Sequence, residues 1–193
     1  GIFVASAVQE GLIRQKLMNR VIYLFFVFCL YIFFSEEMII GTEVIDPGIT
    51  FVFEAAPKDV IYPETNHLSE NETDLHIEML ANWSPTNSVE APVDGFVAYL
   101  NVLVEITNKN GESNKFKLSP HLNLIDNLHY ARNIKLPGSI NDFYDMTFII
   151  KPPDKKIFGV HYDWFHEYGD LIEVKRFEYK DLNFKKIALI ERR

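Results

Sequence analysis

Short stretches of alternating hydrophobic and polar residues fill the chain from about residue 40 onward. In residues 96–107, apolar side chains occupy every second position from Leu100 to Ile106. Successive side chains of a β-strand point to opposite faces, so this alternation predicts a half-buried strand. Comparable segments predict strands at residues 49–55, 74–83, 96–107, 114–119, 129–136, 143–151, 170–179 and 184–191.

Turn-forming sequences separate these segments. They are Asp46-Pro47-Gly48, Lys109-Asn110-Gly111 and Leu136-Pro137-Gly138, and each combines residue types that favour tight turns. Seven or eight short strands at this spacing, with no amphipathic helix between them, predict an all-β fold, an antiparallel β-sandwich. Residues 57–73 and 152–169 are the long connections, where functional residues more often lie.

A different pattern precedes the strands. Residues 21–34 form an uncharged apolar segment with basic residues before it and acidic residues after it. The segment is shorter than the roughly 20 residues of a transmembrane helix and resembles the apolar region of a signal peptide. We therefore interpret residues 1–35 as an N-terminal extension with a signal peptide or uncleaved anchor, and residues 36–193 as an exported domain.

Composition narrows the class of function. The chain has 193 residues, 48% of them hydrophobic, and a formal net charge of −8. An acidic balance argues against a nucleic-acid partner, because binding to phosphates needs a basic surface. The only cysteine, Cys29, lies inside the apolar segment, so the exported domain has neither a disulfide nor a thiolate metal ligand. Any metal site there uses histidine and carboxylate groups.

Candidate metal chemistry begins in residues 74–80, Asp-Leu-His-Ile-Glu-Met-Leu. In a strand, His76 and Glu78 share one face, opposite to the apolar residues between and beside them. An imidazole and a carboxylate placed in this way can bind one cation. The alternative is a half-buried strand whose two polar residues face water.

Four segments resemble the periplasmic iron-transport proteins of the FetP type. Residues 129–133, His-Tyr-Ala-Arg-Asn, resemble the family's His-Tyr-Gly-Ala-Asn, which follows seven residues after the second methionine of a Met-Pro-Met stretch. Residues 74–78 resemble its Asp-Ile-His-Leu-Glu motif. Residues 48–63 are similar to its first strand and the stretch after it, and residues 144–153 to a strand that ends in Glu-Pro-Pro.

The resemblance covers about residues 39 to 180. It implies an immunoglobulin-like β-sandwich that forms a homodimer in the periplasm and works beside an Ftr-type membrane permease. It also implies iron transport and a copper site. His76, His129 and His161 match three ligands of that site, His161 being the second histidine of a His-x-His pair. Glu78 and Asp126 match acidic residues at the same site.

One departure from the family changes the expected chemistry. The spacing to His129 places the family's methionine ligand at Leu122, which has no donor atom. We expect Leu122 to point at the histidines, and the neighbouring His121 to point the other way if this segment is extended. Without a soft thioether, a site of imidazoles and carboxylates suits Fe²⁺, Mn²⁺, Zn²⁺ and Cu²⁺ better than Cu⁺.

The leading interpretation is an exported metal-binding protein without enzymatic activity, because the sequence shows no catalytic motif such as a nucleophile elbow or a phosphate-binding loop. One alternative is a copper-dependent iron oxidoreductase. Another is a purely structural β-sandwich tethered to the membrane, with His129 and His161 as ordinary loop histidines. His67 and His166 are expected to be surface residues, and Tyr162, Trp164 and Phe165 to pack in the core or in a dimer.

Overall fold

The computed structural model describes residues 37–191, and the all-β prediction is confirmed. The strands are β1 (Met38–Ile45), β2 (Ile49–Ala56), β3 (Leu75–Trp83), β4 (Asn101–Asn108), β5 (Ser113–Leu122), β6 (Leu128–Ile134), β7 (Tyr144–Lys151) and β8 (Lys175–Leu182). Short helical segments are η1 (Glu64–Asn66), η2 (Glu70–Glu72), α2 (Tyr162–Tyr168) and α3 (Lys185–Ala188). The apolar segment 21–34, interpreted as part of a signal peptide or anchor, lies outside the described residues.

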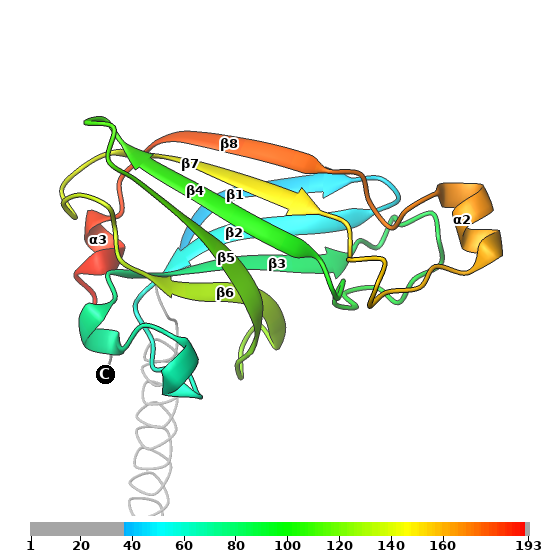
Figure 1. Cartoon of the computed structure of the whole chain (residues 1–193), viewed down its shortest axis with the longest axis horizontal. Coiled ribbons are helices and arrows are strands. Elements are labelled where there is room, and N and C mark those ends of the chain that lie inside the picture. The colour runs from blue at the N-terminus through cyan, green and yellow to red at the C-terminus, as the bar shows by residue number, and fades with distance from the viewer. Residues whose placement is uncertain (1–36, 192–193) are drawn as a thin grey trace, which may run out of the picture. The chain divides into compact units, whose positions relative to one another are not determined.

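All strands pair antiparallel, in the order β1-β2-β3-β6-β5-β4-β7-β8. Strand β5 connects the two layers of the sandwich, because residues up to Leu118 pair with β4 and residues from Ser119 pair with β6. Figure 1 shows β5 crossing from the layer of β4, β7 and β8 to the layer of β1, β2, β3 and β6. The histidines of β3 and β6 lie on the outer face of the second layer, which is the face turned away from the core.

The core lies between the two layers and uses every second residue of each strand. Phe53 of β2 and Phe148 of β7 meet there with ring centroids 4.2 Å apart. Tyr130 of β6 is also buried, and its hydroxyl donates to the Val97 carbonyl at 2.8 Å and accepts from the Leu100 amide at 2.9 Å. These bonds fix Tyr130 on the core face, so its neighbours His129 and Ala131 lie on the outer face.

Strand β1 was not predicted, because its burial is only partial and Gly41 interrupts its apolar pattern. The glycine is required by the packing of β1 on β8. A β-carbon at Gly41 would overlap the Tyr179 ring, whose hydroxyl donates to Glu43 Oε1 at 3.1 Å.

The C-terminal strand prediction is wrong. Residues 184–191 were expected to alternate as a strand, but they contain α3. Phe184 and Ile187 are buried and Ile190 packs against the core. This three-residue spacing places the apolar side chains on one side of a helix. Among the described residues, no helix is long and apolar enough to cross a membrane.

Candidate metal site

Strand β3 is buried on both faces, and its outer face is polar. Leu75, Ile77 and Met79 point into the core, whereas His76 and Glu78 are 3% and 4% exposed on the opposite side. A polar group buried on a sheet face needs partners to compensate for lost hydration. The partners of these two side chains come from β6, β5 and the segment between β2 and β3.

The β5–β6 hairpin places two further histidines on the same face. His121 and His129 are direct cross-strand partners in this antiparallel ladder, which puts their side chains on one face with β-carbons about 5 Å apart. Their flanking residues Leu122 and Leu128 also pair with each other, and both are exposed. The register therefore turns His121 and His129 toward β3 and both leucines toward solvent.

One ring nitrogen from each of His76, His121 and His129 lies within 4.8 Å of the other two. The His76 and His121 rings stack with centroids 5.5 Å apart, and those of His121 and His129 are 6.1 Å apart. Nitrogens that bind one cation at 2.0–2.1 Å lie within about 4.2 Å of each other. The three imidazoles therefore need only small adjustments to share an ion.

Hydrogen bonds determine which nitrogen of His76 is free. The Asn133 amide donates to the carbonyls of Asp59 at 2.7 Å and Leu68 at 3.0 Å. Its oxygen must therefore point at His76 Nδ1, 2.7 Å away, and Nδ1 must carry the proton. This leaves the lone pair of Nε2 for a metal, and a bonded partner of this kind also orients a ligating imidazole.

The other two rings are held in the same manner. His129 Nδ1 lies 3.1 Å from the Asn127 carbonyl, which can only accept, so Nε2 is the free nitrogen. His121 Nε2 lies 3.3 Å from Ser119 Oγ, whereas its buried Nδ1 has no hydrogen-bond partner in the part of the chain that the structure describes. Each ring thus has one nitrogen engaged and one available.

Glu78 lies between the histidines and a group of acids. Its Oε1 is 3.3 Å from His76 Nε2 and 3.8 Å from His129 Nε2, and its buried Oε2 has no hydrogen-bond partner within residues 37–191. One oxygen each of Glu78, Glu37 and Asp126 lie within 4.8 Å of one another. Glu78 therefore belongs both to the histidine group and to a carboxylate group.

Burial decides the charge states of these side chains. It raises the pKa of Glu78 to about 8, with a further rise from the nearby Glu37 and Asp126 carboxylates. It raises the pKa of Glu54, the β2 neighbour of Glu78, to about 7. Burial also lowers the pKa of His76 to about 4 and that of His121 to about 3. Neutral imidazoles keep their lone pairs, which is the form that binds metal.

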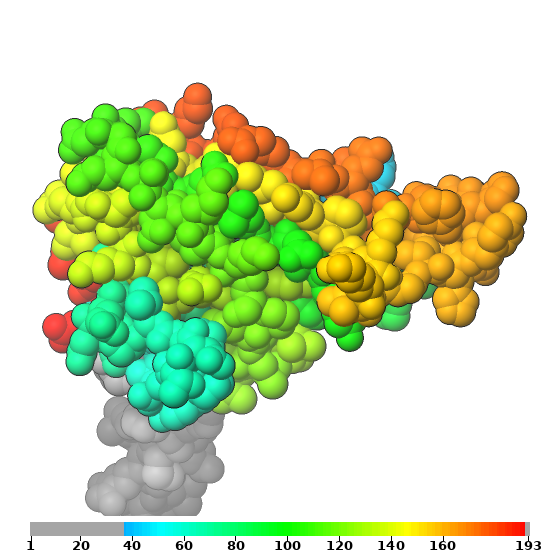
Figure 2. All heavy atoms as spheres, viewed as in Figure 1, coloured from blue at the N-terminus to red at the C-terminus, as the bar shows by residue number. Residues whose placement is uncertain are grey.

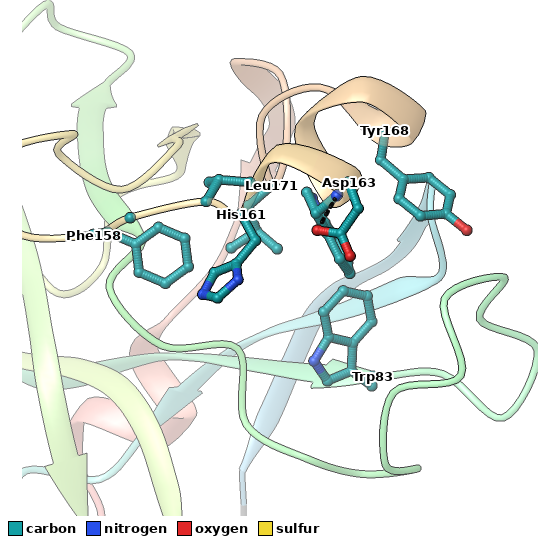
Figure 3. A pocket seen from close by; sticks show the side chains of 9 residues that line it. Trp83, Phe158, His161, Asp163, Tyr168 and Leu171 are labelled. Carbon is teal, nitrogen blue, oxygen red and sulfur yellow. Dashed lines mark hydrogen bonds between the residues drawn. The ribbon is translucent and has the colours of Figure 1, made fainter.

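The structure brings together four of the five predicted ligands, His76, Glu78, Asp126 and His129, but not His161. His161 precedes α2 and lines a cavity of about 620 Å³ that also contacts Trp83. Figure 3 shows His161 beside Phe158 and facing the Trp83 side of that cavity. Trp83 is seven residues along β3 from His76, a distance of about 23 Å. The expectation that His161 joins the same group within one chain is therefore wrong.

Two expectations for neighbouring residues are also corrected. Leu122 was expected to face the histidines, but it is 70% exposed, and His121 occupies that position. His67 was expected to be a surface residue, but it is half-buried and its ring lies edge-on to His121 with centroids 5.0 Å apart. In Figure 2 the β2–β3 segment that carries His67 (teal) lies against the green β5–β6 region.

The sequence contained a signal for His121. In Ser119-Pro120-His121 the proline occupies the middle position of the family's Met-Pro-Met stretch, which aligns His121 with the second methionine. Counting back seven residues from His129 gave Leu122 instead, one residue beyond His121. Asn123 stabilises that turn by accepting hydrogen bonds from the amides of Ile125, Asp126 and Asn127.

The sequence profile of the Fe²⁺ transport proteins matches residues 34–186. The chain belongs to the Fe²⁺ transport protein family. No curated protein sequence matches it.

Solved structures share the fold. A copper-bound variant of P19 from Campylobacter jejuni is 24% identical, with a TM-score of 0.64, and the match covers 76% of this chain and 96% of that one. FetP from uropathogenic Escherichia coli strain F11 is 21% identical, with a TM-score of 0.62 and coverage of 76% and 95%. At these identities the likeness concerns the fold alone. It confirms the FetP-type β-sandwich.

Proposed function

We propose that this protein is an exported metal-binding component of a high-affinity iron uptake system. The observation that carries the proposal is the buried group of His76, His129 and Glu78, in which the Nε2 atoms of both histidines lie 3.3 and 3.8 Å from Glu78 Oε1. Such a group is unfavourable in the interior unless something satisfies it. A divalent cation does so.

The donor set favours transition metals. Imidazoles suit iron, copper, zinc and nickel, and the adjoining carboxylates of Glu78 and Asp126 suit iron and manganese. The family supports iron as the transported ion, and P19 was obtained with copper bound. We therefore assign iron and copper ions to the site of this chain, with carriage toward an Ftr-type permease as its role. Export through the segment 21–34 belongs to the same proposal.

A homodimer is the second part of the proposal, and α2 supports it. Tyr162, Phe165 and Tyr168 of this helix are 81%, 55% and 41% exposed. Figure 2 shows the region around α2 (yellow to orange) extending beyond the sandwich. Exposed aromatic side chains gathered in one place are typical of protein contact surfaces.

The homodimer also accounts for His161. A histidine that matches a family ligand but lies far from its own chain's site can still reach the site of a second copy. We propose that His161 of the partner subunit approaches His76 and His129. Sedimentation equilibrium tests the contact: wild type should be dimeric and Phe165→Ser shifted toward monomer, with exposed Ile39→Ser on β1 as control. A monomeric wild type would contradict this part.

Metal titration tests the function itself. Metal-free protein is titrated with Cu²⁺, Fe²⁺, Mn²⁺ and Zn²⁺, and compared with a His76→Ala/His129→Ala double variant and a His166→Ala control. One ion per chain should bind to wild type and control but not to the double variant. Equal binding by all three proteins would refute the site. Aerobic Fe²⁺ consumption distinguishes a metal carrier from an iron oxidoreductase, because a carrier binds the ion without catalytic turnover.

A further inference from the structure

We propose that His121 is a metal ligand of this chain, occupying the position of the family's methionine, and that the resulting three-histidine site prefers borderline divalent cations such as Cu²⁺ and Zn²⁺ over Cu⁺. The proposal rests on the metal-binding function proposed above and specifies its donor set. It also replaces the expectation that Leu122 leaves the site without a donor at this place.

Geometry is the first argument. One nitrogen of His121 lies within 4.8 Å of nitrogens of both His76 and His129. The ladder pairs His121 with His129 directly, so the side-chain direction follows from the strand and does not depend on a loop. Since β6 pairs in turn with β3, three adjacent strands hold the three imidazoles.

The unsatisfied nitrogen of His121 is the second argument. Its Nδ1 is buried and, among the described residues, has no hydrogen-bond partner, while Nε2 is engaged by Ser119. A buried polar nitrogen without a hydrogen-bond partner is unfavourable, because it has lost its hydration without compensation. A cation between His121 Nδ1 and the Nε2 atoms of His76 and His129 removes this penalty.

The outer side of His121 is covered. The His67 ring packs edge-on against it, and the His76 ring stacks on it. Contact with two other rings restricts the imidazole to few orientations. A restricted ring loses little further freedom when it binds an ion, which favours its use as a ligand.

Donor chemistry gives the preference among metals. A methionine thioether is a soft ligand that stabilises Cu⁺, whereas imidazole is a borderline ligand that suits Cu²⁺ and Zn²⁺. Exchanging one for the other at an unchanged backbone position alters the metal preference without altering the fold. This chain is therefore tuned toward divalent ions by a single side chain of β5.

Three variants of the full-length protein test the proposal, with Cu²⁺, Zn²⁺ and Cu⁺ as probes. His121→Ala should lose at least about 10-fold in Cu²⁺ and Zn²⁺ affinity. His121→Met should lose Cu²⁺ affinity but gain Cu⁺ affinity. Leu122→Met is the matched control: it adds a thioether one residue away on the solvent side and should leave all three affinities unchanged.

Electron paramagnetic resonance of the Cu²⁺ form supplies an independent readout. The nitrogen hyperfine pattern should show one nitrogen fewer in His121→Met than in wild type or Leu122→Met. Melting temperatures confirm that each variant is folded. Should Leu122→Met alter the Cu⁺ affinity while His121→Met does not, the register argument would be overturned.

The outcome is separable from that of the proposed function. If His76→Ala/His129→Ala abolishes binding but His121→Ala does not weaken it, the function stands and this inference fails. If wild-type protein binds no ion, both fail.

Discussion

Two regions carry histidines that match the family's ligands, and they are built in opposite ways. The outer face of β3, β5 and β6 holds its imidazoles on paired strands, buried and oriented by Asn133 and main-chain groups. The region around α2 holds His161 at a helix start, exposed, among aromatic side chains and a cavity (Figures 1 and 3). The first region is organised to bind an ion by itself. The second offers, within one chain, a single histidine beside a cavity and no second metal-binding side chain near it among the residues that line that cavity other than Asp163.

The largest expected difference between the regions concerns ligand removal. His76→Ala should weaken Cu²⁺ binding by more than about 100-fold, since losing even an orienting neighbour of a ligand lowers affinity about 10- to 100-fold. His161→Ala should have no such effect when the chain is diluted to a monomer. Competition against a chelator of known affinity measures both. Equal losses at monomer concentration would erase the distinction between the two regions.

A smaller effect is expected from the group that orients His76. Asn133→Ala removes the acceptor of the Nδ1 proton, so the ring is no longer held in one tautomer. Cu²⁺ affinity should fall about 10-fold or more while the ligands remain present. His161 has no comparable partner among the described residues, and exposed Asn141→Ala serves as the control. Unchanged affinity in Asn133→Ala would show that the ring needs no orienting bond.

The smallest effect concerns the stability of the metal-free protein in solution. The folded-state pKa of Glu54 is about 7, above its ordinary value, because of burial and then of Glu37 and Asp126. The folded state therefore binds the proton more tightly, and stability falls as pH rises from about 4.5 to 7. Glu54→Gln should remove this loss, on the order of 2–3 kcal/mol at pH 8.

Urea unfolding in the presence of a chelator, at pH 5.5 and pH 8, measures the effect. The control is Glu178→Gln on exposed β8, which should retain the wild-type pH dependence. The titration of His76 acts in the other direction: its lowered pKa makes stability fall below about pH 6.5. A Glu54→Gln variant no more stable than wild type at pH 8 would contradict the charge state assigned to this carboxyl.

Alternation along the chain predicted much of the fold and part of the site. It placed His76 and Glu78 together on one face of β3, because strand geometry is periodic and local. It did not place His121, because the direction of that side chain depends on the length of the β5–β6 turn. A shift of one residue in register moves every side chain to the other face.

The other residues whose positions the sequence did not predict depend on contacts between segments that are distant in sequence. Glu37, just before β1, and Glu54 of β2 lie near the site, and no local motif marks them as part of it. His161 matched a family ligand by sequence, but the connection that carries it ends at the opposite end of β3. Its location follows from the path of a long loop, which residue patterns do not determine.

The two acceptors that hold the Asn133 amide are main-chain carbonyls, of Asp59 and Leu68. Nearly every amino-acid replacement at these two positions keeps its carbonyl oxygen, so single missense changes there leave the amide and the His76 tautomer unaffected. Insertions and deletions in the same segment shift both carbonyls. The site is thus robust to point mutation in the covering loop but sensitive to its length, and natural variation in metal affinity should follow loop length more closely than loop sequence.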